Sequence, residues 1–197
     1  IHKAQESLLI ISPYFVPLQS GIEGIKKLQD NNIQVSIVTN SQAANNHLLV
    51  HSGYAPYRKK ILATGAKLYE AKYDTPTIEA LRLDLENSEA TLHTKAFVVD
   101  DKAFFIGSFN FDPRSADINT ELGVMVYSPK MIKSALKNTP QELNEHTYEV
   151  TLNHKKQLQW LDKSQDDVQA LRPEPNTSAW NRFKVKILSL FPIDSQL

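Results

Sequence analysis

Five polar or small residues near the middle of the chain have the types and spacing that phosphate-ester chemistry needs. His93 and Lys95 are separated by one residue, and Gly107, Ser108 and Asn110 follow further along. A histidine imidazole can act as nucleophile or general acid, because its pKa lies near neutrality. A lysine ammonium and an asparagine amide supply the positive charge and the donors that a phosphodiester requires as charge builds in transfer. The pattern therefore predicts chemistry on a phosphodiester.

The elements that must position these side chains are predicted to form a β-hairpin. In a strand over residues 92–99, His93 and Lys95 share one face, because alternate side chains point the same way. The polar run at 100–102 predicts a turn, and residues 103–108 predict the returning strand. The catalytic candidates should therefore gather at one end of a hairpin.

The register of this hairpin accounts for the remaining candidates. Ser108 is expected to lie opposite Thr94, and Asn110 beside His93. Gly107 has no Cβ, so the backbone there can approach a ligand or leave a strand sharply.

Asp100 is predicted to have a structural role. It lies on the opposite strand face from Lys95 and about 16 Å from it, at ~3.3 Å per residue. We therefore expect Asp100 to take no part in the chemistry.

The spacing His-x-Lys-x4-Asp-x6-Gly-Ser-x-Asn resembles the signature of the phospholipase D superfamily. With ordinary residue frequencies, these fixed positions would match by chance in a chain of this length about a few times in a million. Segments at 11–17, 50–58, 109–123 and 179–194 are also similar to the C-terminal half of bacterial cardiolipin synthases of the C type.

This resemblance implies a mechanism with two histidines. In the family, two copies of the motif meet at a two-fold or pseudo-two-fold axis; one His forms a phosphohistidine and the other protonates the leaving alcohol. Because the chain resembles the C-terminal copy, His93 would be the general acid, and the nucleophile would come from a missing N-terminal half. Glu121 falls where the family's orienting carboxylate lies, and Ser108 could assist. No cofactor is implied.

The implied function is that of one half of a phosphatidyltransferase of the cardiolipin synthase type. Its expected partners are a phospholipid similar to phosphatidylglycerol and the N-terminal half, and its expected place is peripheral, on the cytoplasmic side of the bacterial inner membrane. A homodimeric phosphodiesterase or nuclease with one motif per chain is the main alternative. A noncatalytic fragment or membrane-association module is a third.

The composition of the chain narrows its possible functions. The 197 residues include 22 basic and 22 acidic residues, so no global positive field indicates a nucleic-acid partner. Cysteine is absent, which excludes disulfides and thiolate sites. No two histidines have the spacing of metal ligands. We therefore expect catalysis without a metal and no nucleic-acid partner.

The fold class is predicted to be α/β, with a mixed, largely parallel β-sheet flanked by helices. The apolar run at 7–12 predicts a buried strand, followed by a helix at 21–30 and a strand at 34–39. Such a β-α-β unit implies parallel strands. A further helix at 59–64 and a strand at 67–70 would extend the sheet.

A second group of polar residues precedes that helix, in a segment predicted to be a loop. His51, Tyr54, Tyr57 and Arg58 could bind a phosphate or polyol head group, since Arg offers a bidentate fork and Tyr a donor. Alternatively, the tyrosines pack and Arg58 covers an apolar surface.

The rest of the chain divides into a domain at 1–170 and a C-terminal segment at 171–197. That segment combines a proline-containing linker with a basic amphipathic helix at 180–191, which could lie in an anionic membrane interface or pack onto the domain. Inside the domain we expect an acidic insertion at 71–90 with a short helix at 78–86, a loop at 113–119, a buried strand at 121–127, a helix at 129–138 and a hairpin of strands 147–152 and 157–161.

Overall fold

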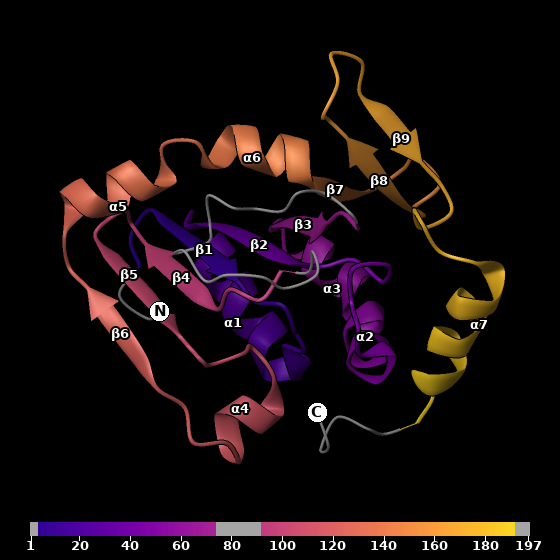
Figure 1. The fold of residues 1–197 in the computed structure, drawn as a ribbon, viewed down its shortest axis with the longest axis horizontal. Coiled ribbons are helices and arrows are strands. Elements are labelled where there is room, and N and C mark those ends of the chain that lie inside the picture. The colour runs from indigo at the N-terminus through magenta and orange to yellow at the C-terminus, as the bar shows by residue number, and fades with distance from the viewer. Residues whose placement is uncertain (1–3, 74–91, 192–197) are drawn as a thin grey trace.

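Continuous apolar runs form the central strands of a nine-stranded mixed sheet, with the order β6-β5-β4-β1-β2-β3-β7-β8-β9 (Figure 1). The structure, a computed structural model, describes residues 4–73 and 92–191. The expected helix at 78–86 lies outside the described residues. The strands are β1 (Ser7–Ile11), β2 (Gln34–Asn40), β3 (Lys67–Ala71), β4 (Ala96–Val99), β5 (Ala103–Gly107), β6 (Gly123–Val126), β7 (Thr147–Leu152), β8 (Leu158–Asp162) and β9 (Gln169–Leu171).

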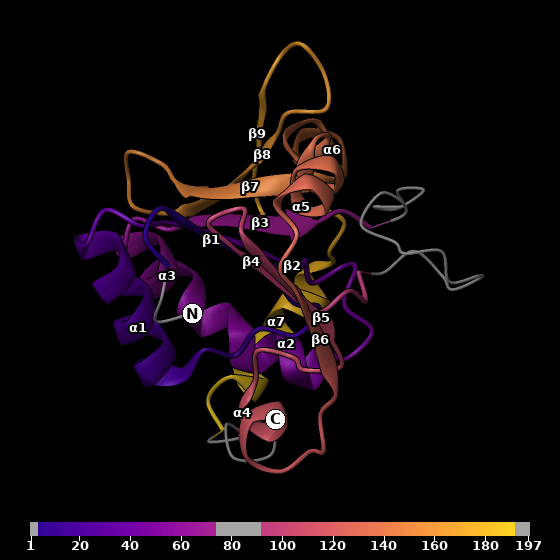
Figure 2. The ribbon, with the colours of Figure 1, turned by 90° about the vertical axis from the view of Figure 1, so that its left-hand side faces the viewer.

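Helices cover both faces of the centre of the sheet. They are α1 (Leu18–Asp30), α2 (Leu48–Tyr54), the 3-10 turn η1 (Ala55–Tyr57), α3 (Arg58–Ala63), α4 (Pro113–Asp117), α5 (Pro129–Leu136), α6 (Thr139–His146) and α7 (Ala179–Leu188). Figure 2 shows α1 and α3 on one side of the sheet, with α5 and α6 on the other. Alternate residues of β1 follow this division: Leu8 and Ile10 pack with Ile25 of α1, whereas Ile11 belongs to a second cluster that includes Leu143 of α6.

The expected α/β class and mixed sheet are confirmed, but parallel pairing is confined to the centre. Within the described residues, β1 pairs with β2 and β2 with β3 in parallel. The other pairings are antiparallel. Two of the antiparallel pairs follow from connection length, because short turns join β4 to β5 and β7 to β8, and a short turn can join only antiparallel neighbours.

Two segments that were expected to be loops are helical. The loop was expected at 51–58, but residues 48–57 form α2 and η1, and Arg58 begins α3; burial of His51 and Tyr54 favours the helix. Residues 113–117 form α4, whose N-cap Asp112 accepts a hydrogen bond from the backbone N–H of Ser115 at 2.7 Å. An Asp followed by Pro at a helix start is a recognisable capping signal.

The expectation of a buried strand at 121–127 is wrong. The strand there is β6, which lies at the edge of the sheet and pairs only with β5 among the described strands. Leu122, Val124 and Tyr127 are between 60% and 81% exposed. An apolar run shows that a strand can be buried, but its position in the sheet decides whether anything covers it.

The C-terminal part is more closely attached to the domain than a linker would be. Strand β9 pairs with β8, and α7 packs against α2. Glu174, between β9 and α7, is buried. Each helix within residues 4–73 and 92–191 falls short of the length and apolarity that crossing a membrane requires.

Candidate active site

The hairpin brings His93 and Lys95 together at its open end. Strands β4 and β5 pair Ala96 with Ile106, and the backbone N–H of Gly107 donates to the carbonyl of Lys95 at 3.1 Å. The ammonium of Lys95 donates to the carbonyl oxygen of His93 at 3.0 Å and lies 3.4 Å from its Nε2 atom. A Cβ on Gly107 would lie 2.4 Å from the carbonyl oxygen of Leu122, so only glycine fits between the strands.

A buried asparagine holds the chain immediately before His93. Asn40, at the end of β2, accepts a hydrogen bond from the backbone N–H of Leu92 at 3.2 Å and donates to the carbonyl of Leu92 at 3.1 Å. Sequence reasoning did not identify this contact. The two bonds fix the segment that presents His93 at the carboxyl end of the parallel strands.

The electrostatic environment favours the neutral form of His93. Partial burial, followed by the charge of Lys95, lowers the pKa of His93 below its usual value. Burial also lowers the pKa of Lys95, although the charges of Glu121 and Asp112 oppose that effect. The imidazole itself is exposed, whereas Lys95 is only 9% exposed. A phosphate arriving at His93 would therefore meet a largely desolvated cation.

Ser108 and Glu121 form a second pair beside this one. The hydroxyl of Ser108 donates to the carboxylate of Glu121 and accepts from the backbone N–H of Leu122 at 3.0 Å. The Ser108 hydrogen bond is the main reason that the pKa of Glu121 lies below its usual value. In this structure Glu121 bonds to Ser108 and reaches Lys95 through charge; a Glu121 bond to the His93 ring remains a prediction.

Asn110 lies on a segment tied to the end of β1. Its backbone N–H donates to the hydroxyl of Ser115 at 3.2 Å, and its buried Oδ1 atom has no hydrogen-bond partner. The next residue, Phe111, donates from its N–H to the hydroxyl of Ser12 at 3.0 Å and stacks on Phe15 with ring centroids 4.9 Å apart. These contacts fix the backbone that carries the Asn110 side chain.

Asp100 lies at the other end of the hairpin, as the strand-parity argument expects. Its carboxylate accepts hydrogen bonds from the backbone N–H groups of Gln5, Glu6 and Ser7, at 2.8 to 3.1 Å. Burial raises its pKa, but these donors more than offset that effect and leave the pKa below its usual value. Asp100 therefore anchors the chain that leads into β1.

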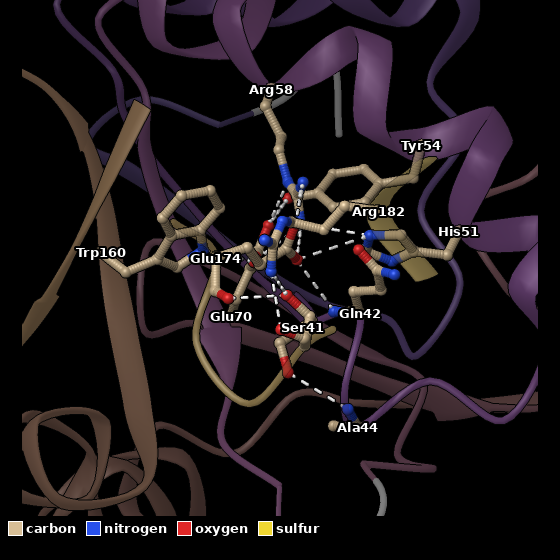
Figure 3. A network of polar contacts seen from close by, with 11 residues as sticks. Ser41, Gln42, Ala44, His51, Tyr54, Arg58, Glu70, Trp160, Glu174 and Arg182 are labelled. Atoms are coloured by element: carbon tan, nitrogen blue, oxygen red, sulfur yellow. Dashed lines mark hydrogen bonds and ion pairs between the residues drawn. The ribbon is translucent and has the colours of Figure 1, made fainter. Parts of the chain in front are cut away.

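The other expected group, at 51–58, is built into the interior (Figure 3). The Arg58 guanidinium, 4% exposed, donates from Nε to Glu70 at 2.6 Å and from Nη1 to Glu174 at 2.9 Å. Tyr54 donates its hydroxyl proton to Glu70 at 2.7 Å, and Arg58 Nη2 lies 3.2 Å from His51 Nε2. Tyr54 and Arg58, which were expected to bind a head group, already bind carboxylates of this chain, so we propose no ligand role for them.

Burial determines the charge states in this network. Burial and then the charge of Arg58 lower the pKa of His51 to about 3. Burial raises the pKa of Glu70. Burial raises the pKa of Glu174 as well, but the charge of Arg58 and the hydrogen bonds from Arg58 and Gln42 act together against burial and leave that pKa below its usual value. Tyr57 is half-buried, with the Lys60 ammonium 5.0 Å from its ring centroid. Sequence reasoning missed both glutamates, and neither has a local signal.

Comparison with known proteins agrees with the motif. The family model described as "Cardiolipin synthase, PLD-like domain" matches residues 1–143. Cardiolipin synthase C from Escherichia coli (strain K12) is 38% identical over 191 residues, which cover 96% of this chain and 40% of that protein. The chain thus spans less than half the length of this relative.

Two solved structures share the fold. Phosphatidylserine synthase from Haemophilus influenzae Rd KW20 aligns with a TM-score of 0.61 at 16% identity, covering 99% of this chain and 42% of that chain. Nuc from Salmonella typhimurium, a phospholipase D family member, aligns with a TM-score of 0.56 at 18% identity, covering 75% of this chain and 83% of that chain. Because the family model covers well over half of the residues, this chain belongs to the cardiolipin synthase family of PLD-like (phospholipase D-like) domains.

Proposed function

We propose that this chain supplies the C-terminal half of the active site of a phosphatidyltransferase that makes cardiolipin-like lipids. The observation that carries the proposal is the pairing of an exposed imidazole, His93, with a mostly buried ammonium, Lys95, at 3.4 Å. Membership of the family and the names of the relatives, cardiolipin synthase and phosphatidylserine synthase, support phospholipid synthesis as the reaction class.

His93 is assigned the role of general acid and then general base. When a histidine of the N-terminal half attacks the phosphorus, a P–N bond forms and the P–O bond to the leaving alcohol breaks. The proton on His93 passes to that alcohol oxygen. Neutral His93 then takes the proton of the acceptor hydroxyl, whose oxygen displaces the histidine and regenerates the phosphodiester.

The lowered pKa of His93 suits both steps. A lowered pKa makes the protonated ring a stronger acid toward the leaving alkoxide, and it leaves the ring neutral for the acceptor hydroxyl. A bound phosphodiester anion would counter the charge of Lys95 and so favour protonation of His93 at the moment when an acid is needed. Lys95 and the amide of Asn110 stabilise the charge on the phosphoryl oxygens.

The second histidine must come from outside this chain, because one imidazole cannot be nucleophile and acid in the same step. We assign it to the N-terminal half of the same enzyme, docked along β6. The exposed apolar side chains of Leu122, Val124 and Tyr127 support this surface, as does its position next to Glu121. The substrate is a lipid of the phosphatidylglycerol type, so we place the enzyme at the cytoplasmic face of the inner membrane as a peripheral protein.

Three preparations test the proposal: this chain alone, the longer parent protein, and a mixture of the chain with its N-terminal half. Each is incubated with phosphatidylglycerol in mixed micelles, and cardiolipin is measured by mass spectrometry. We expect product from the parent and from the mixture, and none from the chain alone. Val124→Glu should abolish activity of the mixture, whereas Val168→Glu, at another exposed valine, should not.

Turnover by the lone chain would contradict the proposal. If its rate rose with the square of concentration and vanished in His93→Ala, the protein would be a homodimeric phosphodiesterase. Equal activity of the Val124→Glu and Val168→Glu mixtures would instead reject β6 as the docking surface and leave the chemistry intact.

A further inference from the structure

Helix α7 turns most of its apolar residues away from the domain. An aromatic face, defined here as Trp180, Phe183, Ile187, Leu190 and Phe191, occupies one side of the helix and the turn that follows it. These side chains are between 41% and 74% exposed. The Trp180 and Phe183 rings stack with centroids 5.6 Å apart, so the face forms a continuous apolar surface.

The other side of α7 holds the helix on the domain. Val185 is buried, and α7 contacts α2. Within the same segment, Arg182 donates from Nη1 to the carbonyl oxygen of Thr177 at 2.6 Å and to its hydroxyl at 2.9 Å, which ties the helix to the turn before it. A helix whose role was packing alone would turn its tryptophan and phenylalanines inward, because they would bury the most apolar area.

The buried network fixes the direction in which the aromatic face points. Glu174, four residues before the N-cap Ser178, accepts hydrogen bonds from Arg58 and from the backbone N–H of Gln42. The Ser178 hydroxyl then caps the helix by accepting from the N–H of Asn181 at 3.1 Å. This short, anchored connection leaves α7 little freedom to rotate and cover its aromatic face.

The charges around the aromatic face match an anionic surface. Lys184 and Lys186 are exposed, and residues 175–191 contain Arg182 but no Asp or Glu. The Lys184 ammonium lies 5.5 Å from the centroid of the Trp180 ring. Aromatic side chains flanked by lysines are suited to the boundary between anionic head groups and acyl chains.

The aromatic face is connected to the candidate active site by a short series of contacts. Gln42, which binds Glu174, is two residues from Asn40, and Asn40 makes the two hydrogen bonds that hold Leu92 next to His93. Figures 1 and 2 both show α7 and α4, the helix that follows the Asn110 segment, in the lower half of the view, and in Figure 1 they lie on either side of α2. The contacts of Gln42 and Asn40 link the base of α7 to the end of the sheet where His93 is presented.

We infer that the aromatic face of α7 docks the protein onto an anionic lipid bilayer, with the rings in the interface and Lys184 and Lys186 against the head groups. The Arg58–Glu174 ion pair holds the residues just before α7 in place and so keeps the aromatic face pointing outward. Binding to a vesicle is measured without turnover. Membrane docking by α7 can therefore fail while the proposed transferase reaction stands, and the reaction can fail while membrane docking stands.

Vesicle sedimentation of the whole chain tests the inference. We expect binding to vesicles of phosphatidylcholine with 30% phosphatidylglycerol, and little binding to pure phosphatidylcholine. Lys184→Glu with Lys186→Glu should weaken binding by roughly 30-fold or more, at ~1 kcal/mol per lysine removed. Lys130→Glu with Lys137→Glu makes the same change of charge at exposed lysines elsewhere and should have far less effect.

Tryptophan fluorescence gives an independent measurement. Trp180 is exposed and Trp160 is buried, so lipids brominated on their acyl chains should quench only the Trp180 emission. Trp180→Phe should bind and show no quenching, whereas Trp180→Ala with Phe183→Ala should bind at least about tenfold more weakly. Circular dichroism checks that each variant is folded.

Three results would overturn the inference. One is equal binding of the wild type and the Trp180→Ala, Phe183→Ala variant to anionic vesicles. Another is a dimer in solution that this double change dissociates, which would make the face a contact between copies. The third is loss of vesicle binding when the N-terminal half is added, which would assign the face to that half.

Discussion

Two clusters in this molecule use the same residue types in opposite ways. At the hairpin, His93 is exposed beside Lys95 and a glutamate; against α2, His51 is buried beside Arg58 and two glutamates. The Arg58 charge meets both carboxylates at hydrogen-bond distance inside the fold. The Lys95 ammonium donates to a backbone carbonyl and feels its acidic neighbours only through charge.

The comparison shows that residue type alone does not define a binding site. A charged side chain can bind a ligand only when the charges of its own protein do not already pair with it. A buried ion pair with matched partners has no capacity left for a ligand, and removing one member leaves an uncompensated charge. The Lys95 ammonium, held close to the exposed imidazole of His93, can still pair with the anion of a ligand. Substitutions at the hairpin should therefore lower turnover, whereas substitutions in the buried network should lower the free energy of unfolding.

The largest expected effect is at His93. In the complete enzyme, His93→Ala should lower turnover by ~10⁴-fold or more, because the acid–base group of both steps is lost. Its unfolding free energy should stay within about 0.5 kcal/mol of the wild type, since the ring is exposed. Steady-state kinetics and urea unfolding measure the two quantities. His154→Ala, at an exposed turn histidine, is the control. A comparable loss of turnover in this variant would show that the effect is not specific to His93.

Arg58 should show the opposite pattern. Arg58→Met leaves Glu70 and Glu174 buried without their cation and should destabilise the chain by about 3–5 kcal/mol. Arg172→Met removes an exposed arginine and should cost less than about 1 kcal/mol. Adding Glu70→Gln and Glu174→Gln to Arg58→Met should recover much of the loss. A stable, inactive Arg58→Met single variant would instead indicate a direct role in the chemistry.

His51 should make stability depend on pH. Its pKa is about 3 in the fold, against an ordinary value of 6.5, so between these values the unfolded chain binds a proton that the folded chain does not. The free energy of unfolding therefore falls as the pH drops from 6.5 toward 3. His51 contributes up to about 1.4 kcal/mol per pH unit to this fall. His51→Gln should show a shallower slope in urea unfolding measured at several pH values. Identical slopes for both proteins would contradict the assignment.

The smallest expected effect is at Asp100. Asp100→Asn removes the charge that three backbone N–H groups share and should cost about 1–2 kcal/mol of stability. Turnover per folded molecule should not change, because Asp100 lies at the far end of the hairpin. Asp101→Asn, at the exposed neighbour, is the matched control for stability. A normally folded Asp100→Asn enzyme that had lost the chemical step would show that the strand-parity argument is wrong.

Local sequence signals predicted the hairpin and its immediate neighbours. Of the strand expected at 92–99, residues 96–99 form β4, and the segment with His93 and Lys95 precedes it. The observed pairing of Ala96 with Ile106 has the register in which Ser108 was expected opposite Thr94. The same kind of signal predicted β1, β2, β7 and the helix at 129–138. These inferences succeeded because strand alternation and turn chemistry act over a few residues.

Contacts between distant residues were beyond those signals. Arg58 and Glu174 are separated by 116 positions, and Asn40 and Leu92 by 52. Nothing in the spacing of His51, Tyr54 and Arg58 indicated that a carboxylate from the end of the chain would fill the place expected for a head group. Burial depends on which elements cover a face, and periodicity identifies only the face.

The sequence by itself therefore determined the residues that can do chemistry, the hairpin that presents them and the family to which the chain belongs. The packing of distant elements decided which charges remain available: it buried Arg58 between two glutamates, left Lys95 bonded to a backbone carbonyl and turned most of the apolar residues of β6 and α7 outward. The physical reason is that a charge or an apolar side chain acts according to its solvation, and solvation is set when distant elements pack together.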